Sequence, residues 1–176
     1  MKRWLVAPAL LLTVCSRGDL GGPATAPGSI TLTSPAFADG EPIPERFTCE
    51  GEDVSPPLEW SGVPEGTAGL ALIMDDPDAP GGTFTHWVIF GLDAGLTRLE
   101  EGADPGGAVQ GMTSFGEVGY GGPCPPPGDP PHTYVFELHA LSAHVDLAEG
   151  AAIEQVRAAV AEASLGAGRL TGTYGR

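Results

Sequence analysis

A carboxylate-rich turn follows one of the apolar runs of the chain. The run GLALIM at positions 69–74 is short enough for a buried strand, and DDPDAP at positions 75–80 comes directly after it. Asp76 and Asp78 therefore stand at a strand end, in a turn that two prolines stiffen, and rigid polar turns suit binding sites. A solvated surface turn is the simpler interpretation of an isolated acidic run. The turn alone only suggests a polar site.

Two histidines and a tyrosine lie in other apolar runs. His86 lies within FTHWVIFGL at positions 84–92, where a lone histidine is more often a hydrogen-bonded core residue than a ligand-binding one. His132 and Tyr134 are two residues apart at the start of a third run, so both point to one face of a strand. They follow GYGGPCPPPGDPP at positions 119–131, whose prolines order the backbone and whose glycines let backbone N–H groups approach a ligand.

An imidazole, a phenol and exposed amides can together bind a phosphoryl or carboxylate group. Each hydrogen bond to a charged partner contributes about 1.5–3 kcal/mol. Two or three of them, net of entropy, give only micromolar to millimolar binding of a bare anion. A tighter ligand needs an apolar portion as well. His139 and His144 fit no such cluster, and we interpret them as structural or surface residues.

The charge of the chain limits its partners. The formal net charge is −15, and Lys2 is the only lysine. Without a leader containing Lys2 and Arg3, six arginines would face 23 acidic residues, a net charge of −17. Such a surface repels nucleic acid and anionic membranes, so neither is an expected partner. An anion site here must use histidine, hydroxyl and backbone N–H donors, or one of the few arginines.

The N-terminus has the pattern of an export signal. Residues 1–14 combine a charged start with a short apolar run, too short to span a bilayer stably. LTVC at positions 12–15 resembles a bacterial lipoprotein cleavage box with Cys15 as the lipidated residue, although Val14 stands where that box has a small residue. Cleavage after Ala26 is the alternative. Residues 15–29 are expected to form a flexible tether, and the protein to be exported, as a periplasmic or cell-envelope lipoprotein.

Two cysteines remain in the mature chain. Cys49 and Cys124 form an even pair, and in an oxidising compartment such a pair is usually a disulfide. A bridge over so long a loop could add roughly 3–5 kcal/mol of stability. The alternative is that Cys124 is a reactive thiol near His132, although no sequence feature indicates a stabilised thiolate.

The remaining pattern predicts a mainly β protein. Its 27 glycines and 18 prolines have no period and separate short apolar runs, which favours strands joined by tight turns. One helix is expected over residues 146–163, ended by Gly166 and Gly168, with apolar residues at helical spacing. The class is a two-sheet antiparallel β-sandwich with a peripheral C-terminal helix. The expected strands are 29–33, 69–74, 84–92, 133–141 and 169–174.

Four ordered segments resemble the phosphatidylethanolamine-binding protein family, in its bacterial Raf-kinase-inhibitor-like branch. The resemblance covers residues 30–176. Its segments are FTCEG at 47–51 through SPPLEW at 55–60, DDPDAP with His86-Trp87, GYGGPCPPPGDPPHTY at 119–134, and GTY at 172–174. Four motifs in order at compatible spacing are far more specific than one alone.

The resemblance implies a small anion pocket at one end of the sandwich. Its residues would be Asp76, Asp78, His86, His132 and Tyr134, with Tyr120 as a wall. The sequence departs from the family pattern at Thr133, where arginine is common, and at Asp53, where asparagine is usual. Members bind phosphate-like or phosphoethanolamine groups, and several inhibit kinases or proteases.

Three kinds of function remain for such a chain. The first is non-catalytic binding of a small anionic ligand, phosphate or a phospholipid head group, without cofactor or metal. The second is inhibition of an extracytoplasmic protease or kinase, although kinases and ATP are scarce outside the cytoplasm. The third is a hydrolase, in which His86, His132 and Asp76 could hold zinc. The sequence lacks a GxSxG elbow, an HExxH motif and a phosphate loop, which favours binding over catalysis.

Overall fold

The computed structural model describes Met1, residues 28–103 and residues 106–176. The predicted export signal, Cys15 and most of the predicted tether lie outside the described residues. A 3-10 turn at Glu45–Phe47 precedes most of the strands. The strands are β1 Gly28–Ser29, β2 Thr31–Thr33, β3 Leu58–Ser61, β4 Gly69–Asp76, β5 Phe84–Leu92, β6 Arg98–Leu99, β7 Val109–Gln110, β8 His132–Leu141 and β9 Ser164–Tyr174, and the helix is α1 Ile153–Ala163.

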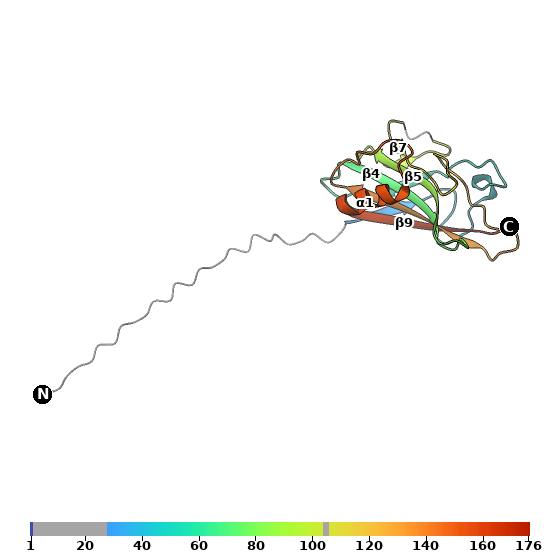
Figure 1. Ribbon diagram of the computed structural model, residues 1–176, viewed down its shortest axis with the longest axis horizontal. Coiled ribbons are helices and arrows are strands. Elements are labelled where there is room, and N and C mark those ends of the chain that lie inside the picture. Colours follow the sequence, from blue (N-terminus) through green and yellow to red (C-terminus); the bar gives the residue numbers. More distant parts are fainter. Residues whose placement is uncertain (2–27, 104–105) are drawn as a thin grey trace.

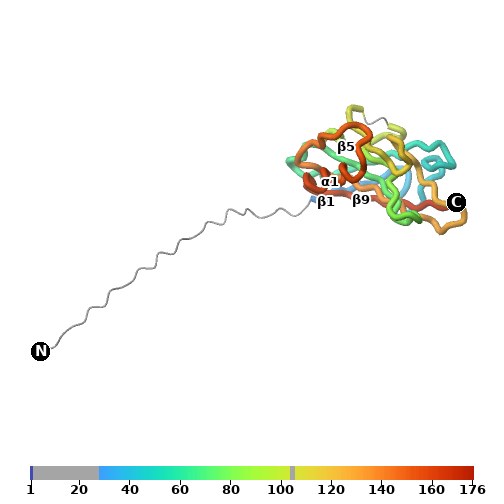
Figure 2. Tube along the Cα trace, viewed as in Figure 1, coloured from blue at the N-terminus to red at the C-terminus, as the bar shows by residue number. Residues whose placement is uncertain are grey.

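The strands form two sheets, as the sequence predicts for a sandwich. The large sheet has the order β1-β9-β8-β4-β5-β7 and the small sheet the order β2-β3-β6. Every pairing is antiparallel except β1 with β9. Helix α1 lies over one face of the large sheet (Figure 1). Strand β1 and the C-terminus lie at opposite ends of the sandwich (Figure 2).

The alternation of side chains along β4 divides the core in two. Leu70, Leu72 and Met74 are fully buried in the main core between the sheets. Ala71 points to the other face and packs in a second cluster with residues of α1, among them Val156. Asp76 continues the inward-facing series at the end of β4, which places a carboxylate where the core meets one end of the sandwich.

The first expected strand is divided between the two sheets. Ser29 pairs with β9 in the large sheet, whereas Thr31 pairs with β3 in the small sheet. Ile30, between them, is buried. The segment thus crosses from one sheet to the other and helps to close the sandwich.

The expected bounds of the helix and of the last strand were wrong. Helix α1 begins at Ile153 rather than at residue 146, because the backbone just before it bonds to other segments: Gly150 N–H donates to Gln110 and Met112 N–H to Ala151. Strand β9 begins at Ser164, directly after the helix. Gly166 and Gly168 therefore lie in a strand, where a Cβ atom would collide with the backbone of Gly28 and Ile30.

Candidate functional site

A bulge in β5 turns His86 toward the interior of the sandwich. Met74 pairs with Trp87, but the next residue, Asp75, pairs with Thr85, so the register shifts and β5 holds one extra residue. That residue is His86. Bulges of this kind re-aim a side chain, and here the imidazole lies 5.2 Å from the ring of buried Tyr134, measured between centroids. Without the shift, strand alternation would place His86 on the face opposite to Trp87.

Asp76 fixes the second histidine. Its Oδ2 lies 2.7 Å from His132 Nδ1, and both side chains are buried. Its Oδ1 accepts a hydrogen bond from the backbone N–H of Asp78 at 2.8 Å. Asp78 in turn accepts one from Thr133 N–H at 2.8 Å, which ties the turn after β4 to the start of β8. The carboxylates of Asp76 and Asp78 therefore fix His132, the turn after β4 and the start of β8 relative to one another.

The two imidazoles have the same hydrogen-bonding pattern. His86 Nδ1 lies 2.8 Å from the carbonyl oxygen of Gly121, so Nδ1 must carry the proton, as it does in His132 beside a carboxylate. Among the described residues, neither Nε2 atom has a hydrogen-bond partner. Burial lowers the pKa of His86, and the Gly121 carbonyl and the Asp76 charge oppose this only in part. His86 is therefore neutral at pH 7, with a free Nε2 lone pair.

The ring of Tyr134 packs against the imidazole of His86. Its side chain is fully buried, and its Oη is a buried polar atom without a hydrogen-bond partner in the described chain. Burial, and next the negative charge of Asp76, raise the pKa of this phenol well above its usual value. The hydroxyl keeps its proton at any physiological pH and is available as a donor.

Three of these groups, Asp76, His86 and His132, line a small pocket of about 180 Å³. It is smaller than the roughly 300–1,000 Å³ of drug-sized ligand sites, so it suits a compact group. Among the described residues, neither arginine nor lysine lines it. The lining residues are Asp76, Ala79, Pro80, Phe84, His86, Phe115, Cys124, Pro125, Pro126 and His132.

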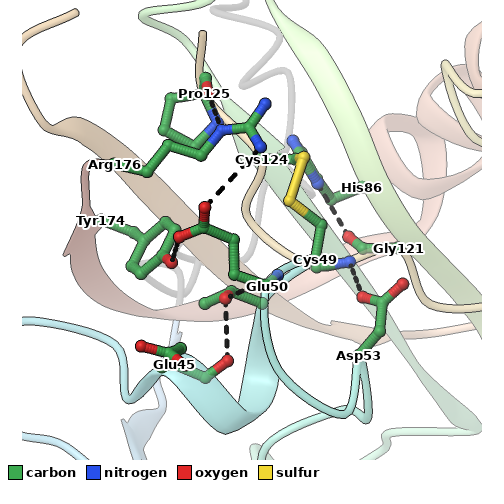
Figure 3. The surroundings of a disulfide bond; sticks show 12 residues. Glu45, Cys49, Glu50, Asp53, His86, Gly121, Cys124, Pro125, Tyr174 and Arg176 are labelled. Atoms are coloured by element: carbon green, nitrogen blue, oxygen red, sulfur yellow. Dashed lines mark hydrogen bonds and ion pairs between the residues drawn. A yellow bond between two sulfur atoms is a disulfide. The ribbon is translucent and has the colours of Figure 1, made fainter. Parts of the chain in front are cut away.

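A disulfide holds the Gly/Pro loop that closes one side of this pocket (Figure 3). Cys49 and Cys124 are joined, which confirms the predicted pair and leaves Cys124 without a free thiol. The backbone N–H of Cys49 donates to Pro123 O at 3.2 Å. From the other direction, Arg176 donates to Pro125 O and Tyr174 Oη donates to Glu50 at 2.7 Å. The loop is thus fixed to two distant segments of the chain.

Of the residues considered at the sequence level, Asp78 and Tyr134 are not among the lining residues, and three others, Tyr120, Asp53 and Thr133, also lie away from the lining. Tyr120 packs its ring on Trp87 and donates its hydroxyl to Phe47 O at 2.7 Å, and with Asp53 it borders a different hollow. Asp53 adopts a left-handed backbone (φ 55°) and accepts a bond from Gly122 N–H at 2.7 Å. Asp53 therefore holds the Gly/Pro loop at Gly122 through this hydrogen bond. Thr133 contributes its backbone N–H to Asp78.

Sequence reasoning missed the aromatic side chains of the pocket. Phe84 and Phe115 both line it, with ring centroids 4.7 Å apart. Phe84 lies two residues before His86 in β5, so strand alternation points both to one side. Phe115 follows no motif, and only the fold brings it to the pocket.

Two features are absent from the described residues. Within residues 28–103 and 106–176, no group of three or more His, Cys, Asp and Glu side chains is arranged to hold a metal ion. The helix in this part of the chain lacks the length and apolar character needed to cross a membrane.

The fold and the pocket define a β-sandwich with a polar site at one end. The sequence model of the phosphatidylethanolamine-binding protein family matches residues 33–175, and the chain belongs to that family. It is 45% identical over 156 residues to "Putative lipoprotein LppC" of Mycobacterium tuberculosis, covering 89% of this chain and 77% of that one.

Two crystal structures agree with this assignment. CT736 of Chlamydia trachomatis superposes with a TM-score of 0.79 at 39% identity, over 84% of this chain and 98% of that one. YbcL of Escherichia coli, described as a member of the mammalian PEBP family, has a TM-score of 0.79 at 35% identity with the same coverage. The predicted family and fold class are confirmed.

Proposed function

We propose that the protein binds a small anionic ligand in the pocket between His86 and His132 and does not act on it chemically. The observation that carries this proposal is that the two imidazoles have the same hydrogen-bonding arrangement. Each uses Nδ1 for a protein acceptor and leaves Nε2 without a described partner, at a pocket whose one lining carboxylate already accepts two hydrogen bonds. A proton on either Nε2 would add a charged donor for an anion.

Catalysis has less support from the same geometry. The Asp76–His132 pair has the arrangement that orients a general base. The described lining holds no serine, threonine or free thiol for such a base to activate, since Cys124 is in a disulfide. Binding a ligand, unlike catalysis, requires only the hydrogen bonds that these groups can form.

We also propose that the protein works outside the cytoplasm. The disulfide suits an oxidising compartment, and the relative LppC carries a lipoprotein name. Both fit the predicted export signal and a lipid anchor at Cys15. Inhibition of an extracytoplasmic protease stays a prediction.

Sulfate binding should strengthen as the pH falls. Sulfate keeps its charge between pH 5 and 8, so a change in its affinity with pH reports a change in the protonation of the protein. An anion beside Nε2 favours the imidazolium, which raises the pKa of His86 on binding and takes up protons from solvent. The gain begins as the pH falls through this raised pKa and levels off below the pKa of His86 in the free protein, which burial keeps below its usual 6.5. It can reach about tenfold per pH unit for each proton taken up.

Calorimetric titration of the full chain with sulfate checks this. We expect one site of micromolar to millimolar affinity, weakened at least about tenfold by His132→Ala, because one charge-assisted hydrogen bond is lost. His86→Gln should also weaken binding, and His139→Ala, on the helix-facing side of the sheet, should not. A thermal melt of each variant shows that it is folded at the titration temperature. Equal binding by wild type and both pocket variants would contradict the proposal, and protease inhibition would be tested next.

A further inference from the structure

Phe115 is an exposed aromatic side chain at the mouth of the pocket. Its exposed fraction is 46%, unusual among the large apolar residues of the described chain. Its ring nevertheless contacts the site: its centroid lies 4.7 Å from that of Phe84 and 5.2 Å from that of His86, both edge-to-face. One face of the ring is thus ordered against the pocket while part of the side chain stays open to solvent.

A rigid turn holds Phe115 in this position. Ser114, directly before it, exchanges two hydrogen bonds with Thr85 of β5: Ser114 N–H donates to Thr85 O, and Thr85 N–H donates to Ser114 Oγ, both at 2.9 Å. Thr113 closes the turn with two bonds to Glu117 O, from its N–H and from its hydroxyl, each at 2.9 Å. The ring is therefore positioned by the same strand whose bulge presents His86.

Gly121 gives the ring its space. A Cβ atom at position 121 would come within 2.6 Å of the Phe115 ring. The carbonyl of the same residue accepts the hydrogen bond of His86 Nδ1. Gly121 therefore both orients the His86 imidazole and leaves space for the Phe115 ring, so the positions of the two rings depend on the same residue.

We propose that Phe115 determines the specificity of the pocket and that the preferred ligand is an anionic group attached to an aromatic or compact apolar group. This inference rests on the proposed anion site. The polar lining groups are Asp76 at the end of β4, His132 at the start of β8 and His86 in β5, and most of the remaining lining is apolar: Phe84, Phe115, Ala79 and prolines. A cavity of roughly 150 Å³ is sufficient for benzene in another protein, and this pocket has about 180 Å³. A phenyl group that extends out of the pocket would contact the exposed part of the Phe115 side chain.

Phenyl phosphate and methyl phosphate separate the two contributions. They share the phosphate monoester and differ in the group that would meet Phe115. We expect the wild-type full chain to bind phenyl phosphate about two- to tenfold more tightly, the size of one aromatic contact. In Phe115→Ala the preference for phenyl over methyl phosphate should be largely lost, because Phe84 is then the remaining aromatic ring of the lining. Phe115→Leu should lie between, and Val118→Ala, an exposed residue of the same turn (41%), should behave as wild type.

The outcomes distinguish the inference from the proposed site. If methyl phosphate binds to wild type but the phenyl preference is absent, or survives Phe115→Ala, the specificity assigned to Phe115 is wrong and the anion site stands. If neither ester binds to wild type, the proposed site fails and this inference fails with it. Because Phe115 is 46% exposed, its replacement should lower the melting temperature only modestly, and circular dichroism verifies that each variant is folded.

Discussion

Removing the Cys49–Cys124 disulfide is expected to lower the free energy of unfolding by about 4–5 kcal/mol. The bridge joins residues separated by 75 positions, and the chain-entropy treatment gives about 4.5 kcal/mol for a loop of that size. The native state loses order as well, because the bridge holds the Gly/Pro loop whose Gly121 carbonyl orients His86. This would be a large part of the roughly 5–15 kcal/mol that stabilises a typical domain.

Urea unfolding of the full chain measures this effect. The double variant Cys49→Ala with Cys124→Ala is compared with wild type, with and without a reducing agent. Reduction should move the wild-type midpoint toward that of the variant and should leave the variant unchanged. An unchanged midpoint in the double variant would show that the loop is held by its hydrogen bonds alone.

Replacing Asp76 by alanine is expected to cost about 3–5 kcal/mol and to abolish anion binding. Asp76 is only 3% exposed and accepts bonds from His132 Nδ1 and from Asp78 N–H. Removing one member of a buried pair leaves the other unsatisfied, which is costly. His132 also loses the partner that fixes its tautomer and orientation, so Nε2 no longer faces the ligand in one geometry.

Asp129→Ala is the matched control, since Asp129 is an exposed carboxylate in the neighbouring Gly/Pro loop. Urea midpoints and sulfate titrations of both variants test the expectation. Asp76→Asn keeps the shape of the side chain and should fall between alanine and wild type in stability. A stability of Asp76→Ala equal to that of Asp129→Ala would mean that the buried pair contributes little.

Much of the site follows from residue types and spacing, because its polar residues stand at strand ends. Asp76 ends one apolar run and His132 begins another, and antiparallel pairing of β4 with β8 brings those ends together. The disulfide follows from a cysteine count. The strands β4, β5 and β8 are likewise apolar runs, visible without any knowledge of the fold, whereas only the second half of β9 was expected.

The remaining features depend on contacts distant in sequence. No local pattern indicates the register shift that turns His86 inward, because it comes from the pairing of β5 with β4. The helix starts late because Ala151 accepts a bond from Met112, a tertiary contact that periodicity cannot show. Phe115 reaches the pocket only because Ser114 is anchored to Thr85.

The most direct test of the anion site is to observe the imidazole nitrogens during a sulfate titration. The chain has four histidines, and nitrogen-detected NMR resolves each ring with its tautomer. We predict that the Nε2 signals of His86 and His132 shift toward the protonated form with one common saturation curve, while those of His139 and His144 stay in place. Shifts at His139 or His144 alone, or none at His86 and His132 at saturating sulfate, would contradict an anion site between the two histidines.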